Sequence, residues 1–288
     1  MKSLTVNDYN FHYTNEGNGK PVMFVHGSLN DLRSWENQTK YFSKQYNVIT
    51  YSRRYHYPNK AIEPISDYSV SVHSNDLVKL IKSMDLDQVN LVGSSYGAYV
   101  ALMASIQIPD RVKSLVLGEP PVISFLVSDV DNKLQALSLF IRDFQTGKSF
   151  IKFGVKGMDP AKKQFQKGNL TEGVRLFVNG VIGEGAFEEL PEIIKSNLMD
   201  NSIALKAELL GPGFPHKFSH DKAEKLKVPV LLVYGERSLK FFHSISDKLE
   251  NLLPKSHKLK VSNASHDIHQ DNPESYNTKV REFIEEYN

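Results

Sequence analysis

Residues 93–97 read Gly-Ser-Ser-Tyr-Gly, a G-x-S-x-G pattern that can present a serine nucleophile. An apolar run (89–93) leads into the pattern, and small and apolar residues that favour a helix follow it. A sharp strand-to-helix turn holds the central serine in a strained conformation with an accessible hydroxyl. The pattern therefore predicts Ser95 as a nucleophile, with Ser94 as the weaker candidate. The alternative is a tight turn without a catalytic role.

A serine hydroxyl reacts well only when a neighbouring base accepts its proton, and imidazole suits this role at neutral pH. His266 lies between the last predicted strand, HKLKV (257–261), and the last predicted helix. From that loop it can reach over the edge of a sheet to Ser95. His269, three residues further on, is the alternative base.

Alternating strands and helices must position these side chains. Short apolar runs at 21–27, 46–52, 89–93, 112–118 and 228–235 predict buried strands, and their near-continuous apolar character favours a parallel sheet covered on both faces. Helical patterns occupy 33–44, 67–84, 96–107, 242–252 and 273–286. The alternating opening stretch with Asn7-Asp8 predicts an antiparallel hairpin at the sheet edge. The fold class predicted is α/β with a mostly parallel sheet.

The regular alternation stops between residues 121 and 215, where helical stretches occur without a clear strand. We interpret 121–215 as a helical cap, or lid, over the C-terminal edge of the sheet. The core would then comprise 1–120 and 216–288. A separate small domain with its own function is the alternative.

Two further stretches carry a family resemblance. VMFVHGSLNDLRSWE (22–36) has a strand followed by His-Gly and a tryptophan, and NASHDIHQDNPESY (263–276) has A-x-H, an acidic residue, a spacer and proline. With the serine pattern, they resemble the α/β-hydrolases of the capped esterase, epoxide hydrolase and dehalogenase group over nearly the whole chain. The resemblance implies that His266 is the base and that His269 is a surface or helix-entry residue. It also implies acyl chemistry, because Ser95 replaces the aspartate that forms alkyl-enzymes.

The resemblance also implies where an oxyanion hole lies. Two N–H groups must point at the tetrahedral intermediate, and the matching amides are those of Tyr96 and Ser28. His26 matches a histidine that braces the loop. The stretch YSRRYHYPN (51–59) departs from the family, which has a glycine-rich turn there. It is either a braced surface loop or a source of the pocket residues Arg54 and His56. Trp35, in the stretch 22–36, is a further candidate pocket residue.

The acid that would orient the histidine is missing from its usual position in the family. In LVYGERSLKFF (232–242) the usual aspartate position carries Ser238, whose hydroxyl cannot supply the charge. Glu119, in LVLGEPP (115–121), directly follows a strand glycine, and some dehalogenases and lactone hydrolases of this fold place their acid there. We predict Glu119 as the acid, with Glu236 as the alternative.

These assignments predict a serine hydrolase that cleaves a small ester or lactone through an acyl-enzyme. The alternatives are a carbon–carbon bond hydrolase of oxo-acids and a ligand sensor on the same fold with slow hydrolysis. Labelling by a fluorophosphonate probe separates a reactive serine from an inert pocket, and turnover of p-nitrophenyl esters then separates an enzyme from a sensor.

The amino-acid composition limits which partners and metal sites are expected. The 288 residues carry a net charge of +2, which gives no case for nucleic acid or an anionic membrane surface. There is no cysteine, so disulfides and thiolate metal sites are excluded. Because neither a secretory signal nor an apolar run of about 18 residues is found, we expect a cytoplasmic protein. We expect it to take a small, partly apolar substrate and to need no cofactor or metal, and its oligomeric state stays open.

Overall fold

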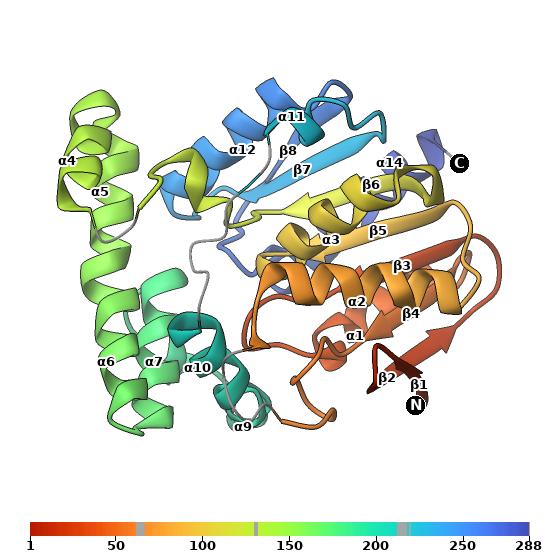
Figure 1. Ribbon diagram of the computed structural model, residues 1–288, viewed down its shortest axis with the longest axis horizontal. Coiled ribbons are helices and arrows are strands. Elements are labelled where there is room, and N and C mark those ends of the chain that lie inside the picture. Colours follow the sequence, from red (N-terminus) through yellow and green to blue (C-terminus); the bar gives the residue numbers. More distant parts are fainter. Residues whose placement is uncertain (62–66, 130–131, 212–217, 219, 288) are drawn as a thin grey trace.

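The computed structural model describes the chain apart from residues 62–66, 130–131, 212–217, 219 and 288, and a mostly parallel β-sheet forms its centre (Figure 1). The described sheet has eight strands in the order β1-β2-β4-β3-β5-β6-β7-β8. Strands β3 to β8 run parallel, whereas β2 is antiparallel to both β1 and β4. The predicted α/β architecture is therefore confirmed. The strands are β1 (Lys2–Val6), β2 (Tyr9–Glu16), β3 (Pro21–Val25), β4 (Asn47–Tyr51), β5 (Val89–Ser94), β6 (Val112–Gly118), β7 (Val230–Gly235) and β8 (Ser256–Val261).

The predicted hairpin forms the sheet edge. Strand β1 pairs with β2 so that Val6 faces Tyr9. The two turn residues between them, Asn7 and Asp8, have φ values of 50° and 54°. Two left-handed residues in succession give a turn whose twist matches that of the flanking strands, and Asn and Asp tolerate this conformation best after glycine.

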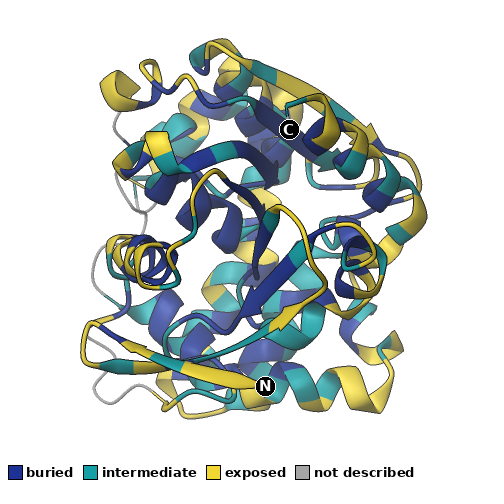
Figure 2. Ribbon diagram, turned by 90° about the vertical axis from the view of Figure 1, so that its right-hand side faces the viewer, coloured by how far each residue is buried: buried dark blue, intermediate teal, exposed yellow. Residues whose placement is uncertain are grey.

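Helices cover both faces of the sheet, which explains why the strands are almost wholly apolar. Successive residues of β3 alternate between two core clusters: Met23 and Val25 pack with helices on one face, and Val22 and Phe24 with helices on the other. Figure 2 shows the central strands buried and the outer helix surfaces exposed. One face carries α2 (Val70–Ser83), α3 (Tyr96–Gln107) and α12 (Lys240–Leu252); the other carries α1 (Glu36–Phe42) and α14 (Pro273–Glu286).

A run of helices separates β6 from β7 in the sequence, with no strand among the described residues of 119–229. Figure 1 shows these helices beyond the carboxyl ends of the parallel strands, on the left of the view. They are α4 (Lys133–Arg142), α5 (Phe144–Phe153), a π-helical turn (Gly154–Met158), α6 (Asp159–Gln166), α7 (Leu170–Val181), α8 (Ala186–Glu189), α9 (Glu192–Asp200) and α10 (Ser202–Leu210). We call them the cap helices. The predicted boundary at 215–216 lies outside the described residues, and the division into cap and core remains a prediction.

Helix α5 depends on a side-chain cap and on a close approach to α4. The Asp143 side chain caps it by accepting from the N–H of Thr146, and Gly147 lets α5 approach α4, because a Cβ there would collide with the backbone of Phe140. Glycine has low helix propensity, so the sequence pattern obscures a helix that tertiary packing requires.

Candidate active site

Ser95 occupies a strained turn between β5 and α3. Its φ of 52° and ψ of −123° lie in a region that non-glycine residues rarely adopt. A Cβ at Gly93 would lie 2.5 Å from the Cα of Ala98, and one at Gly97 would collide with the carbonyl oxygens of Val25 and His26. Both glycines are therefore required by close approach, and the surrounding structure holds Ser95 in its conformation.

Three side chains from separate loops form a hydrogen-bonded chain. His266 Nε2 lies 2.9 Å from Ser95 Oγ, and His266 Nδ1 lies 2.6 Å from Glu119 Oε2. The His266 ring stacks on Phe242 with the ring centroids 4.2 Å apart, which restrains its tilt. The structure thus brings together the predicted nucleophile, base and first-choice acid. This arrangement can take a proton from the serine hydroxyl and stabilise the resulting imidazolium.

The two candidate acids lie in very different surroundings. The Glu119 side chain is fully buried and also accepts a hydrogen bond from the N–H of Gly235 at 2.9 Å. The Glu236 side chain is 43% exposed, pairs with Lys260 and accepts from the N–H of Asn263 at 3.1 Å. The Asn263 amide, with Lys260 beside it, lowers the pKa of Glu236. Only Glu119 of the two contacts His266.

His269 is buried, so the expectation of a surface residue is wrong, but it lies near the start of a short helix, in line with the helix-entry alternative. It belongs to α13 (Ile268–Asp271), and its ring stacks on Trp35 with the centroids 4.1 Å apart. Burial lowers the pKa of His269. Its Nε2 forms no hydrogen bond with the described residues. His269 therefore contributes to packing between the terminal loop and the core.

The loop after β3 lies beside the nucleophile. A Cβ at Gly27 would lie 3.2 Å from the Ser95 Cβ. Ser28 lines the same cavity as Ser95 and Tyr96, and its hydroxyl donates to Glu208 Oε1 at 2.6 Å. Ser28, in this loop, and Tyr96, at the start of α3, thus border the same cavity as Ser95.

A cavity of about 530 Å³ opens above Ser95 and His266. Its walls are mostly apolar and come largely from the cap helices and from Phe241 and Phe242 of α12. A cavity of this size suits a small organic ligand. Its polar side chains include Glu208 of α10, a residue that the sequence analysis did not select.

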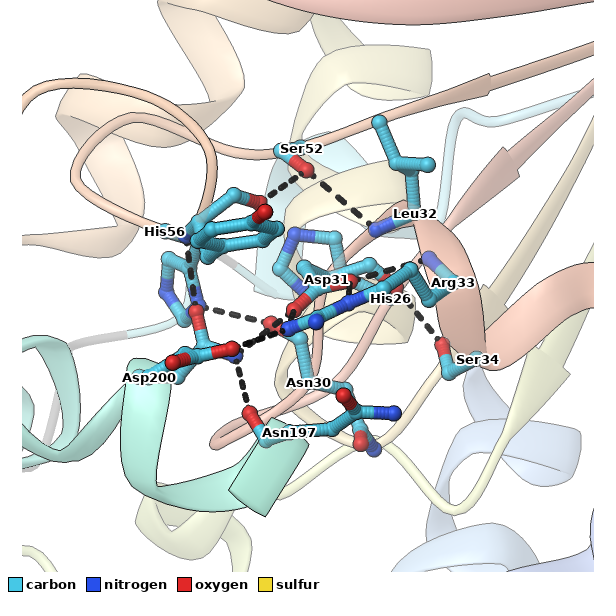
Figure 3. Close-up of polar contacts among 12 residues, drawn as sticks. His26, Asn30, Asp31, Leu32, Arg33, Ser34, Ser52, His56, Asn197 and Asp200 are labelled. Atoms are coloured by element: carbon cyan, nitrogen blue, oxygen red, sulfur yellow. Dashed lines mark hydrogen bonds and ion pairs between the residues drawn. The ribbon is translucent and has the colours of Figure 1, made fainter. Parts of the chain in front are cut away.

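The three expected pocket residues do not line this cavity, which corrects that expectation. Trp35 is fully buried against Phe24 with the ring centroids 4.9 Å apart. Arg54 forms an ion pair with Asp76 at 2.7 Å. His56 is fully buried, and its Nδ1 contacts the carbonyl oxygen of Asn30 at 2.7 Å (Figure 3). The large side chains of 51–59 therefore brace the core and the loop after β3.

The described residues contain no group of three or more His, Cys, Asp or Glu side chains arranged to hold a metal ion. None of the described helices combines the length and apolar character needed to cross a membrane.

Comparisons with known proteins agree with the fold. A family model for the alpha/beta hydrolase fold matches residues 20–147. The uncharacterized hydrolase YraK of Bacillus subtilis is 24% identical over 271 residues, covering 89% of this chain and 97% of that protein. Epoxide hydrolase 3 of Xenopus tropicalis is 23% identical over 296 residues, covering 96% of this chain and 75% of that protein. A solved thermophilic esterase from Thermogutta terrifontis superposes with a TM-score of 0.76 at 17% identity, covering 100% of this chain and 99% of that chain.

The sheet order, the strand-to-helix turn at Ser95 and these matches define an α/β-hydrolase fold. The chain is a hydrolase of this fold.

Proposed function

We propose that this hydrolase is a serine esterase or lactonase that works through an acyl-enzyme. The observation that carries the proposal is the hydrogen-bonded chain from Ser95 through His266 to Glu119 at the floor of an apolar cavity. An aspartate nucleophile would form an alkyl-enzyme, whereas a serine paired with a histidine favours attack on a carbonyl carbon.

In the proposed first step His266 Nε2 accepts the hydroxyl proton of Ser95 while Oγ attacks the carbonyl carbon. The amides of Ser28 and Tyr96 would stabilise the oxyanion. His266 then donates the proton to the leaving oxygen, which departs as an alcohol and leaves the acyl group on Ser95. Water, deprotonated by His266, then attacks the acyl group. His266 returns this proton to Ser95 Oγ as the acid is released. Glu119 would hold Nδ1–H in place and stabilise the imidazolium in both steps.

The cavity supports an apolar substrate. Side chains such as Phe150, Phe177 and Phe241 line it, so an apolar acyl or alcohol group gains free energy by leaving water there. We therefore propose a small to medium-sized ester or lactone whose larger part is apolar.

Turnover of p-nitrophenyl esters and labelling by a fluorophosphonate probe test this function. We expect the wild type to label at Ser95 and to favour longer apolar acyl chains over acetate. Ser95→Ala should abolish both labelling and turnover, and His266→Ala should lose a similar factor because base and nucleophile act as one unit.

The matched control is Ser94→Ala, which removes the neighbouring hydroxyl of the same turn. It should still label and turn over esters. Labelling that persists in Ser95→Ala would show that another serine is the nucleophile. A wild type that cleaves oxo-acids at a carbon–carbon bond but not esters would replace the proposed reaction with its alternative.

A further inference from the structure

The loop after β3 is held mainly by parts of the molecule outside the sheet. Residues 28–31 follow one another in this loop, and each has a separate partner. Ser28 Oγ donates to Glu208 of α10 at 2.6 Å, and the carbonyl oxygen of Asn30 contacts His56 Nδ1 at 2.7 Å. Leu29 packs into an apolar cluster formed by the cap helices. We call residues 28–31 the oxyanion loop.

Asp31 ties the same loop to the junction of α9 and α10. Its Oδ2 accepts from Asn201 Nδ2 at 2.8 Å and from Arg33 Nη2 at 2.7 Å. Arg33 Nη2 also donates to Asp200 at 2.9 Å. Figure 3 shows Asp31 of the loop and Arg33 next to Asp200 of α9. The position of the cap helices therefore determines where the oxyanion loop lies.

Leu29 indicates that the loop would not keep this shape by itself. Its φ of 60° is left-handed, although its side chain is only 2% exposed and belongs to the same cluster as Phe165 and Leu205 of the cap. A non-glycine residue in this region costs on the order of 1–3 kcal/mol and persists only where its surroundings impose it. The cap cluster supplies those surroundings.

Glu208 is a cap residue whose side chain borders the site. It is 7% exposed and lines the cavity with Ser95. Its second carboxyl oxygen lies 3.1 Å from the Tyr68 hydroxyl, which accepts from Arg53 Nη1 at 3.1 Å. Arg53 is fully buried and also donates to the carbonyl oxygens of His26 and Gly27. Buried charges are tolerated when they are paired and hydrogen-bonded. Here Arg53 holds the carbonyls of His26 and Gly27 directly before the oxyanion loop, and Glu208 holds Ser28 within it.

We propose that Glu208 is a positioning residue that aligns the oxyanion hole, so that the cap helices complete the catalytic site as well as cover it. Glu208 fixes the hydroxyl of Ser28, and through it the direction of the Ser28 N–H. Neither the Glu208 carboxylate nor the Ser28 hydroxyl binds the substrate in this role. The inference rests on the proposed acyl transfer, since only a tetrahedral intermediate needs this amide.

Glu208→Gln and Ser28→Ala test the proposal from both sides of the hydrogen bond. Ser28→Ala keeps the backbone amide and removes only the contact with Glu208. Loss of one oxyanion donor costs about 10²–10³-fold in kcat, and misalignment should cost less. We expect each variant to lower kcat about 10-fold or more, with KM changed less than about twofold, as for a loss confined to the transition state. The double variant should lose little more than either single one, because both remove the same contact.

A trifluoromethyl ketone inhibitor distinguishes a misaligned oxyanion hole from a general disturbance of the site, because its adduct with the serine carries an oxyanion. Its inhibition constant should rise by the same factor as kcat falls, while the affinity for the alcohol product stays unchanged. Glu192→Gln is the matched control, an exposed cap glutamate on α9 that pairs with Lys195; it should change neither quantity. If Glu208→Gln fails to fold, Ser28→Ala alone decides the outcome.

Amide hydrogen exchange gives a readout that does not depend on turnover. Residues 26–33 should exchange faster in Glu208→Gln and Ser28→Ala than in the wild type or Glu192→Gln. Unchanged exchange together with unchanged kcat would overturn the proposal. A rise in KM alone, confined to substrates with a hydroxyl or ammonium group, would also overturn it and would make Glu208 a substrate ligand. A wild type that fails to label refutes the proposed function instead, and the exchange result still decides whether Glu208 holds the loop.

Discussion

Glu119 reaches His266 because the backbone turns sharply where β6 ends. Its φ is 45°, its N–H donates to the carbonyl oxygen of Val233 at 3.1 Å, and its Oε1 accepts from Gly235 at 2.9 Å. Backbone and side chain are thus both tied to β7, which leaves Oε2 for the histidine. Ser238 is buried nearby, but its hydroxyl makes no hydrogen bond with the described residues. The carboxylate has therefore moved to the neighbouring strand.

Glu119→Gln should lower kcat by up to ~10⁴-fold, because a neutral amide neither stabilises the imidazolium nor enforces the correct tautomer. Glu236→Gln is the matched control. The Glu236 side chain is 43% exposed and contacts Lys260, so its replacement should change kcat less than about threefold. Ester turnover at saturating substrate measures both. The opposite ranking would make Glu236 the acid.

Site residues that lie in recognisable local motifs could be predicted from the sequence. Site residues that reach the cavity only through the packing of the cap helices could not. Ser95 and His266 follow from the motifs around them, and Glu119 follows from its place directly after the strand glycine. Glu208 is one of several glutamates in the helical stretch 187–210, and only the seating of α10 against the loop brings it into the cavity. Nothing in its immediate sequence distinguishes it.

At the scale of elements, the strands were predictable because burial on both faces leaves an apolar run with sharp ends. The cap helices were harder because glycines interrupt them. Gly157, in the π-helical turn after α5, meets Gly180 of α7 so closely that a Cβ at Gly180 would lie 2.5 Å from the Cα of Gly157. Two helices cross here with almost no side chain between them. Such glycines lower helix propensity in the sequence and permit close packing in the structure.

Gly180→Ala should destabilise the cap helices by about 1–3 kcal/mol, the usual cost of overpacking a tight site. Because Val178 and Val181 of α7 line the cavity, the preference among acyl chains should change as well. Gly154→Ala is the matched control in the same helical run, where a Cβ meets nothing within 4 Å. It should be neutral or stabilise by up to about 1 kcal/mol. Urea unfolding and a chain-length series measure both effects; equal behaviour of the two variants would show that the helices do not cross so closely.

At the scale of the whole molecule, a buried polar network joins the sheet, the 51–59 loop and the cap. The Tyr68 hydroxyl lies at its centre, within hydrogen-bonding distance of Arg53, His56 and Glu208. His26 extends it, because its Nε2 accepts from the N–H of Arg53 at 2.8 Å while its Nδ1 contacts the carbonyl oxygen of Gly27 at 2.9 Å. A proton added to His26 Nε2 would break the first of these contacts.

The network should make the fold sensitive to acid. Burial lowers the pKa of both His26 and His56 well below 6.5, and the nearby Arg53 cation adds to the effect. The unfolded chain protonates each histidine near its ordinary pKa whereas the folded chain does not, so the stability that they contribute is present above pH 6.5 and is lost as pH falls. Each proton accounts for about 1.4 kcal/mol per pH unit. Glu208 acts in the opposite direction, because burial raises its pKa and its ionisation disfavours the fold as pH rises.

Single variants can measure how much His56 alone contributes to the pH dependence of stability. His56 faces Arg53, His26, His73 and Tyr68, and no carboxylate is among the groups that shift its pKa most. Between pH 6.5 and 5.5 the free energy of unfolding should fall less steeply in His56→Gln than in the wild type, by about 1.4 kcal/mol per pH unit at most. His257→Gln, at an exposed histidine of β8, should keep the wild-type slope. Urea unfolding across this range measures the slopes; parallel curves for all three proteins would mean that His56 gains its proton equally in the folded and unfolded states.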